Sequence, residues 1–246
     1  MNRNTTYYWR IDEVNSEGTT TGTVWSFTTS NPILKIMPLG DSITQGGTHY
    51  RYKLWHKLLN NGYDRLNFVG SHDVLVNDTY DSQDYDKDHD GHAGWKTDNV
   101  LYGGGPSEGG TGNITSWLSG LQATDEVPDI VLMHLGTNDI NAGDSASGTI
   151  NELKAVIDIL RSYNPNVTVL VAKVIPCLIE GYPGVEGLNA LIPNLDTYET
   201  ATSDVIIVDH YTDFLESWLQ GDLIHPNAAG ATEMSDRWYD ALLPIL

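Results

Sequence analysis

Three short segments of the chain carry residue types that could together perform nucleophilic hydrolysis. The first is residues 40–44 (Gly-Asp-Ser-Ile-Thr), which directly follow the apolar run 33–39. A serine at the end of a buried strand can be presented on a sharp turn with its hydroxyl exposed, as a nucleophile must be. The alternative is that Ser42 only starts a helix, which is the commonest role of a serine after a strand. The segment taken alone does not separate these two interpretations.

The second segment, residues 222–226 (Asp-Leu-Ile-His-Pro), supplies the partners that a serine needs. A serine hydroxyl is a poor nucleophile at neutral pH, so it requires a base, and the base requires a group that orients it. His225 is the candidate base, and a tight turn could bring the Asp222 carboxylate to its Nδ1. The alternative is that Asp222 and His225 only cap the last helix. Because the two segments occur together, we favour a catalytic triad of Ser42, His225 and Asp222.

The third segment, residues 136–139 (Gly-Thr-Asn-Asp), offers a donor for the oxyanion that forms on attack. Preorganised hydrogen-bond donors stabilise such an oxyanion. We expect three of them: the Asn138 amide, the backbone N–H of Ser42 and the backbone N–H of Gly94. Glycine lets the backbone approach a substrate closely, although Gly94 could also be a simple turn residue.

Two neighbours of these residues are candidates for substrate binding. Asp41 precedes the proposed nucleophile, and Trp95 follows Gly94. An aromatic ring beside the site could stack on a sugar, so we expect Trp95 to contact the substrate.

The elements that must position these residues follow an α/β pattern from Ile33 onward. Strands are expected at 33–39, 65–69, 129–135, 167–175 and 204–209, and helices at 50–61, 113–122, 147–163, 186–201 and 227–243. Strand–helix alternation predicts a parallel sheet with right-handed crossovers. A strand order of 2-1-3-4-5 would place Ser42 and Asn138 together at the carboxyl edge, where ligands bind in such sheets. The segment 71–112 lacks clear periodicity and is expected to be a long, functional connection.

The first 31 residues differ from the rest. The runs 7–14 and 23–29 alternate in the manner of strands, with a turn-rich link at 15–22. This is a β-hairpin pattern, and it resembles the last two strands of a fibronectin type III module. We therefore expect residues 1–31 to be a remnant of such a module and residues 32–246 to be the catalytic domain. A lone hairpin with this much aromatic surface should either dock on the catalytic domain or pair with a second copy of the chain. The pairing would make a homo-oligomer contact.

Composition restricts the partners. The formal net charge is −20 and the isoelectric point is about 4.4. Such acidity disfavours nucleic acid and anionic membranes, so a neutral substrate is expected. The sequence contains no recognisable signal peptide, yet we expect the native full-length protein to be secreted. The single cysteine, Cys177, excludes an intrachain disulfide and is expected in the core.

Metal binding receives little support from the sequence. The residues Asp86, Asp88 and Asp90 have the opening spacing of an EF-hand calcium loop, but the twelfth position is Thr97 rather than glutamate. A solvated acidic loop is the favoured interpretation. The other histidines show no zinc-site spacing. We expect no metal or organic cofactor.

In their order and wording, the segments resemble the GDSL, or SGNH, hydrolase superfamily. The resemblance covers about residues 33–246 and includes residues 40–44, Gly94 within 91–95, residues 136–139 and residues 222–226. Residues 36–42, 67–71 and 88–95 look most like carbohydrate esterase family three, the acetyl xylan esterases. The resemblance implies a three-layer α/β/α, flavodoxin-like SGNH hydrolase fold with a five-stranded parallel sheet. It also implies removal of acetyl groups from a carbohydrate such as acetylated xylan.

Two other functions remain open at this stage. One is a general short-chain aryl or alkyl esterase, or a lysophospholipase. The other is a calcium-dependent carbohydrate-binding or adhesion module without catalysis, suggested by the acidic loop and the hairpin.

Overall fold

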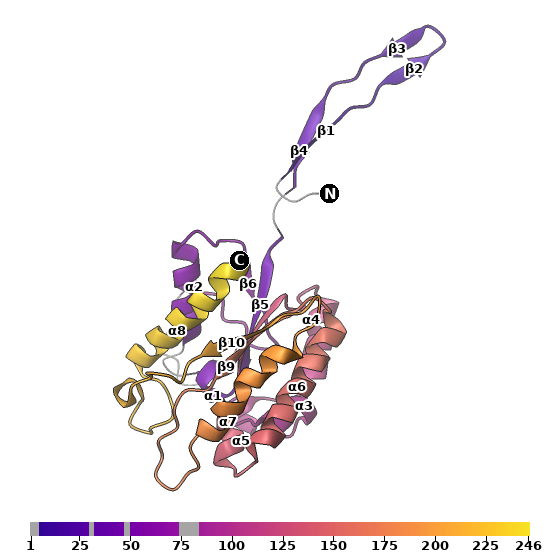
Figure 1. The fold of residues 1–246 in the computed structure, drawn as a ribbon. Helices are drawn as coiled ribbons and strands as arrows, with labels where there is room; N and C mark the ends of the chain where they lie inside the picture. Colours follow the sequence, from indigo (N-terminus) through magenta and orange to yellow (C-terminus); the bar gives the residue numbers. More distant parts are fainter. Residues whose placement is uncertain (1–4, 30–31, 47–49, 74–83) are drawn as a thin grey trace. The chain divides into compact units, whose positions relative to one another are not determined.

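The chain divides into two compact units, Met1–Ile33 and Leu34–Leu246 (Figure 1). The computed structural model describes every residue except 1–4, 30–31, 47–49 and 74–83.

The first unit is a long β-hairpin. Strand β1 (Thr6–Trp9) pairs antiparallel with β4 (Trp25–Thr28), and β2 (Glu13–Asn15) pairs with β3 (Gly18–Thr20). The expected link at 15–22 is therefore too long, because pairing continues to a tight turn after Asn15. The Asn15 side chain accepts a hydrogen bond from the Glu17 N–H (2.8 Å), which closes that turn locally.

The second unit is built on a parallel sheet in the expected order. The sheet runs β10 (Val205–Asp209), β9 (Thr168–Lys173), β8 (Ile130–His134), β5 (Leu34–Gly40) and β6 (Leu66–Phe68). Starting from β6, and numbering these five strands by their order along the chain, the sheet order is 2-1-3-4-5. A short strand that the sequence did not predict, β7 (Asp90–Gly91), pairs with the end of β5. The carboxyl ends of β5 and β8 lie side by side, with Gly40 opposite His134.

Helices cover both faces of this sheet and make three layers (Figure 1). Helices α2 (Tyr50–Asn60) and α8 (Ala228–Leu242) pack on one face. The other face carries α3 (Thr97–Tyr102), α4 (Ile114–Ala123), α6 (Ala146–Tyr163) and α7 (Glu186–Leu191). Along β8, Ile130 and Leu132 enter one core while Val131 and Met133 enter the other, as the twofold strand period requires.

Short helices complete the unit. They are α1 (Ser42–Gln45), α5 (Thr137–Asn141) and the 3₁₀ turns η1 (Ser107–Gly109), η2 (Ile192–Tyr198), η3 (Glu216–Trp218) and η4 (Leu243–Ile245). The expected helix at 186–201 is thus two elements, and it breaks where Pro193 stands at the start of η2. Helix α3 lies inside the segment 71–112, where periodicity did not indicate one.

Strand β5 tolerates a proline because its neighbours on one side are short. Ile36 and Gly40 both accept hydrogen bonds on the β6–β7 side, from Val69 N–H and His92 N–H. Pro38 lies between them and faces the same side, where β6 pairing ends at Ile36 and β7 pairing begins at Leu39. The missing N–H of Pro38 therefore costs no ladder hydrogen bond.

Two further observations concern the whole chain. Cys177 is buried, as expected, and its Sγ lies 3.4 Å from Asn141 Oδ1. Within the described residues, no helix has the length and apolar character needed to cross a membrane.

Candidate active site

Ser42 lies where the sequence placed it, on a tight turn between β5 and α1. A Cβ on Gly40 would come within 2.2 Å of Thr44 Oγ1 and 2.8 Å of the His134 carbonyl, so only glycine allows this turn. Asp41 caps α1, because its Oδ1 accepts a hydrogen bond from Ile43 N–H (2.9 Å). The turn fixes the direction in which the Ser42 hydroxyl points.

A buried arginine holds the far end of α1. The Arg51 guanidinium donates to the carbonyls of Thr44 (2.7 Å) and Gln45 (3.2 Å). Positive charge at a helix C-terminus is favourable, and these carbonyls have no helical partner of their own. Sequence reasoning missed Arg51, since nothing in the helical pattern of residues 50–61 marks this side chain as buried.

Ser42, His225 and Asp222 are connected by two hydrogen bonds. His225 Nε2 lies 2.8 Å from Ser42 Oγ, and His225 Nδ1 lies 2.7 Å from Asp222 Oδ2. A carboxylate only accepts, so Nδ1 must carry the proton and the neutral ring presents a bare Nε2 to the serine. This tautomer is the one that can take a proton from a hydroxyl.

The turn from Asp222 to His225 is fixed by its own side chain. Asp222 Oδ1 accepts hydrogen bonds from the backbone N–H groups of Ile224 and His225, both at 3.0 Å. Leu223 has a φ of 59°, an uncommon backbone conformation for a non-glycine residue. The Leu223 carbonyl accepts from Leu178 N–H (2.9 Å), which holds the turn in place.

The helix-capping alternative for Asp222 and His225 does not describe the structure. Asn227 caps α8 instead, accepting from Ala229 N–H (2.9 Å) and Gly230 N–H (3.2 Å). Asp222 instead contacts His225, and His225 contacts Ser42.

The electrostatics of Asp222 suit an ionised partner for His225. Burial would raise the pKa of Asp222, but hydrogen bonds from the His225 ring and from the backbone of Ile224 and His225 outweigh it. The pKa of Asp222 is consequently held below its ordinary value. The carboxylate stays charged at neutral pH, opposite the nitrogen where positive charge would develop.

Asn138 and Gly94 border the same cavity, next to the turn that carries His225. This cavity has a volume of about 470 Å³, and its lining also includes Ile224, the residue before His225. Gly94 has a φ of +74°, a region that side chains disfavour. Asn138 Nδ2 donates to the Trp95 carbonyl at 2.9 Å, which leaves its second N–H for another acceptor.

The loop that carries Gly94 is tied down by residues outside the predicted set. Both carboxylate oxygens of Asp139 accept from Thr97 N–H, at 3.0 and 3.1 Å. Gln45 Oε1 accepts from Ala93 N–H at 2.6 Å. The pair Asn138 and Asp139 thus binds residues 95 and 97, and α1 itself holds residue 93.

The two substrate-binding candidates need correction. The Trp95 side chain is 1% exposed, and its Nε1 donates to the Pro106 carbonyl at 2.9 Å, so the ring packs in the core and cannot stack on a sugar. Asp41 is also 1% exposed and acts as the α1 cap. Burial raises the pKa of Asp41 to about 6, opposed by its hydrogen bond from Ile43 and by attraction to His225.

The acidic stretch is not an EF-hand. Asp86 turns its carboxylate to the backbone, accepting from Phe68 N–H (2.8 Å) and Asp88 N–H (3.3 Å). Asp90 lies in β7 with a fully buried side chain, so the expectation of a solvated acidic loop is wrong at this residue. Asp90 instead lies beside His72 and His92.

Comparison with known proteins agrees with this geometry. The profile of the GDSL-like Lipase/Acylhydrolase family matches residues 39–232. The chain belongs to this family. Among solved structures, the chain is similar to an acetyl esterase mutant with an acetate ion, at 31% identity and a TM-score of 0.73 over 86% of this chain and 97% of that one. A carbohydrate esterase family 3 protein from Talaromyces cellulolyticus matches at 32% identity and the same TM-score and coverage. A family 3 carbohydrate esterase from Clostridium thermocellum matches at 28% identity and a TM-score of 0.68, over 86% of this chain and 96% of that one.

A curated relative extends well beyond this chain. A multidomain esterase of Ruminococcus flavefaciens is 30% identical over 225 residues, which are 85% of this chain and 28% of that protein. The family and these neighbours confirm the predicted α/β fold and make Leu34–Leu246 a carboxylic ester hydrolase domain.

Proposed function

We propose that the protein is a serine esterase that removes acetyl groups from carbohydrate, with Ser42 as nucleophile, His225 as general base and acid, and Asp222 as orienting carboxylate. The observation that carries the proposal is the position of His225 between Ser42 Oγ at 2.8 Å and Asp222 Oδ2 at 2.7 Å. This arrangement has the roles and distances of a nucleophile, its base and the group that orients the base.

The reaction follows from that arrangement. His225 Nε2 takes the hydroxyl proton as Ser42 Oγ attacks the acyl carbon, and a tetrahedral intermediate forms. The bond to the alcohol oxygen then breaks, and His225 returns the proton to the leaving alcohol. A water molecule, deprotonated by His225, attacks the acyl carbon of the acyl-serine. The bond to Ser42 Oγ then breaks, His225 returns the proton to Ser42 Oγ, and the acid is released.

The oxyanion would be stabilised by donors at one end of the site. Ser42 is the first residue of α1, so its N–H has no carbonyl within the helix to bond. The other two candidate donors are the backbone N–H of Gly94 and the second N–H of Asn138, and both residues line the adjacent cavity. Each donor aimed at developing charge is worth on the order of 3 kcal/mol of barrier, about a hundredfold in rate.

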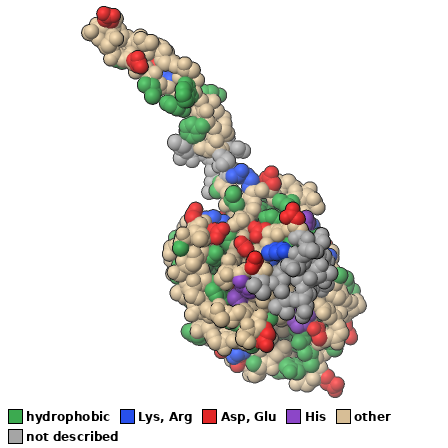
Figure 2. Space-filling model, turned by 180° about the vertical axis from the view of Figure 1, so that it is seen from behind, with side chains coloured by type: hydrophobic (Ala, Val, Ile, Leu, Met, Phe, Trp, Pro, Cys, Tyr) green, Lys and Arg blue, Asp and Glu red, His purple; other side chains and the backbone are tan. Residues whose placement is uncertain are grey.

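Two observations favour acetyl as the acyl group and carbohydrate as the alcohol. The similar acetyl esterase was crystallised with an acetate ion, and two further neighbours are family 3 carbohydrate esterases. Acidic side chains are spread over the visible face of this unit (Figure 2), in keeping with a net charge of −20 and a neutral substrate. A polymeric substrate would also require the native protein to act outside the cell.

An acyl-chain series tests the proposal. Initial rates on p-nitrophenyl acetate, butyrate and octanoate, together with acetate release from acetylated xylan, should show the highest kcat/KM on acetate and release from the polymer. Ser42→Ala should be inactive on all of them. An optimum at octanoate would contradict the acetyl-carbohydrate assignment. So would acetate release from the polymer that is much slower than hydrolysis of p-nitrophenyl acetate.

A further inference from the structure

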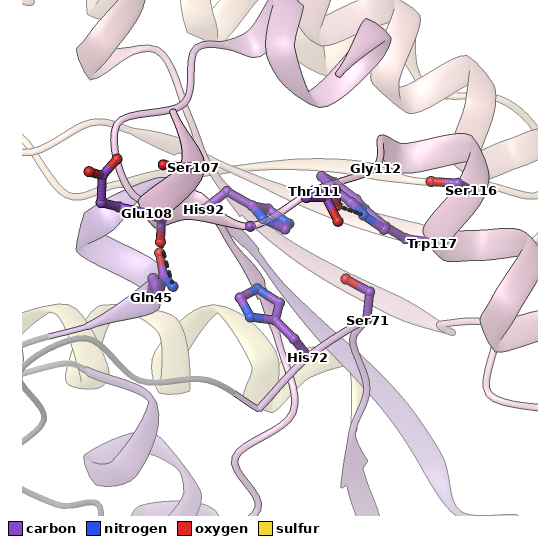
Figure 3. Close-up of a pocket in the computed structure, with 11 residues that line it drawn as sticks. Gln45, Ser71, His72, His92, Ser107, Glu108, Thr111, Gly112, Ser116 and Trp117 are labelled. Atoms are coloured by element: carbon purple, nitrogen blue, oxygen red, sulfur yellow. Dashed lines mark hydrogen bonds between the residues drawn. The ribbon is translucent and has the colours of Figure 1, made fainter. Parts of the chain in front are cut away.

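A second group of chemically capable side chains lies outside the proposed triad. His72, Asp90 and His92 each offer one ligand atom, and these atoms all lie within 4.8 Å of one another. Asp90 and His92 are almost fully buried, and His72 is partly buried. His72 and His92 border a cavity of about 490 Å³ (Figure 3).

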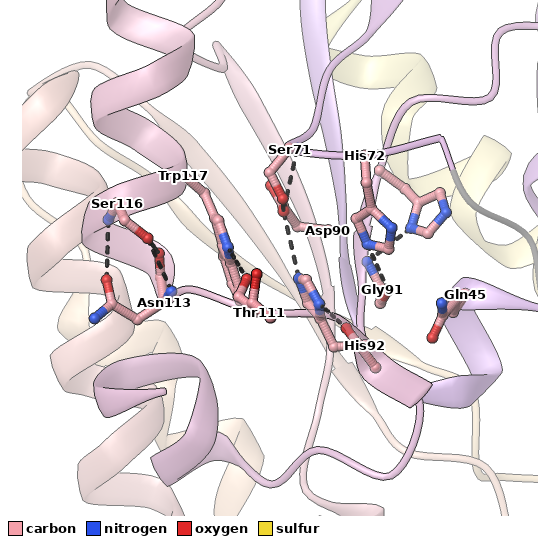
Figure 4. Close-up of polar contacts among 12 residues, drawn as sticks. Gln45, Ser71, His72, Asp90, Gly91, His92, Thr111, Asn113, Ser116 and Trp117 are labelled. Atoms are coloured by element: carbon pink, nitrogen blue, oxygen red, sulfur yellow. Dashed lines mark hydrogen bonds and ion pairs between the residues drawn. The ribbon is translucent and has the colours of Figure 1, made fainter. Parts of the chain in front are cut away.

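Backbone carbonyls fix the tautomers of both histidines. His92 Nδ1 lies 2.5 Å from the Gly109 carbonyl, and His72 Nε2 lies 3.0 Å from the Gly91 carbonyl (Figure 4). A carbonyl only accepts, so these nitrogens carry the protons. The neutral rings therefore keep bare lone pairs on His92 Nε2 and His72 Nδ1. Metal-binding histidines have this same pattern, in which the second ring N–H donates to a carbonyl or carboxylate.

The bare nitrogen of His92 faces a carboxylate. His92 Nε2 lies 3.4 Å from Asp90 Oδ1, and it has no hydrogen-bond partner among the described residues. Asp90 Oδ2 is likewise without one in that part of the chain, while Oδ1 accepts from Ser71 N–H (3.2 Å) and from the Ser71 hydroxyl. Two acceptors that face each other in a buried place repel unless a cation lies between them. A single shared proton would remove the repulsion between Asp90 and His92. It would not use the bare Nδ1 of His72, which a metal would.

We propose that His72, Asp90 and His92 bind a divalent transition metal of the zinc type. Two imidazoles and one carboxylate are a familiar zinc donor set, with the fourth position left to water or another ligand. At Zn–N and Zn–O distances near 2.0–2.1 Å, neighbouring tetrahedral ligand atoms are about 3.3 Å apart, close to the His92–Asp90 separation.

The site would connect two segments of the chain that are distant in sequence, beside the proposed nucleophile. His72 follows β6, Asp90 lies in β7 and His92 follows β7, so the metal links residues up to twenty positions apart. β7 pairs with the last two residues of β5, immediately before Asp41 and Ser42. The residue after His92, Ala93, donates its N–H to Gln45 Oε1. The metal therefore stabilises the segment that leads to Gly94.

Calorimetric titration tests the site directly. Protein freed of metal with a chelator is titrated with ZnCl₂, and one equivalent should bind. His72→Ala and Asp90→Asn should each weaken binding by at least about tenfold, since even loss of a supporting contact costs that much. Glu108→Gln is the matched control, because Glu108 lines the same cavity without belonging to the ligand set. It should leave the affinity unchanged, and so should His225→Ala, which removes the other imidazole–carboxylate pair.

Circular dichroism establishes which variants fold, and Co²⁺ gives a readout that needs no variant. Four-coordinate Co²⁺ absorbs visible light far more strongly than hydrated six-coordinate Co²⁺, so the unsubstituted protein should show the strong bands and release them to added Zn²⁺. Absence of zinc binding, unchanged affinity in folded His72→Ala and Asp90→Asn, loss of binding in His225→Ala, or a spectrum of hydrated Co²⁺ would each overturn the proposal.

Discussion

Replacing Asp222 by asparagine should disable His225 through its tautomer. Asp222 Oδ1 already accepts two backbone N–H groups, from Ile224 and His225, so the amide oxygen of an asparagine would occupy that position. Its NH₂ group would then face His225 Nδ1, which must become an acceptor. The ring proton moves to Nε2 and points at Ser42 Oγ, where a bare nitrogen is needed.

The expected size of the effect follows from this wrong tautomer. In serine hydrolases with the same geometry, such a change lowers kcat by about ten-thousandfold, or about 5.4 kcal/mol of barrier. KM should change little, because the ground-state contacts of the substrate are untouched. Steady-state kinetics on p-nitrophenyl acetate measure both values. Asp240→Asn, which changes the same charge at an exposed position on α8, is the matched control and should retain full activity.

Substantial activity in a folded Asp222→Asn variant would contradict this role of Asp222. If Asp222→Asn keeps more than about a tenth of the kcat of the unsubstituted protein, with an unchanged melting temperature, the tautomer of His225 is not controlled by this residue.

Three further outcomes can be checked independently. Asn138→Ala should lower kcat about a hundredfold with a modest change in KM, because an oxyanion donor acts mainly in the transition state; a change confined to KM would make it a substrate contact. Burial raises the pKa of Asp41 to about 6, so its ionisation destabilises the fold as pH rises from about 4 to 6, by about 3 kcal/mol. Urea unfolding should show Asp41→Asn gaining stability over the unsubstituted protein at pH 7 and losing that advantage at pH 4; an equal difference at both pH values would contradict this. Deleting residues 1–30 should change the melting temperature or the mass in size-exclusion chromatography while esterase activity remains; no change in either would show that the hairpin neither docks nor pairs.

Much of the fold could be predicted because the signals were local. Continuous apolar runs marked the five main strands, and their alternation with helical patterns predicted a parallel sheet. The order 2-1-3-4-5, which is common in doubly wound folds, is the order observed. Strand β7 could not be predicted, because two residues carry no periodicity and Asp90–Gly91 pairs only with the end of β5. Helix α3 was missed because Asp139, more than forty residues away, supplies a partner for its first N–H.

Part of the candidate site could likewise be predicted from local patterns, and part could not. Ser42, Asn138 and the Asp222–His225 turn lie directly after strands or before the last helix, so short patterns sufficed. The burial of Trp95 could not be inferred from its position beside Gly94, because it depends on packing against residues 105–109. The grouping of His72 with His92 also depends on the third dimension, since twenty residues separate them and no zinc spacing appears in the sequence.

The most direct test of the central claim is to trap the acyl group on Ser42. The protein is mixed briefly with p-nitrophenyl acetate, quenched in acid, digested and analysed by peptide mass spectrometry. We expect a burst of p-nitrophenol no larger than one equivalent and a single acetyl group on Ser42, both abolished in Ser42→Ala. Acetylation at another residue, or continued turnover by purified Ser42→Ala protein, would contradict it.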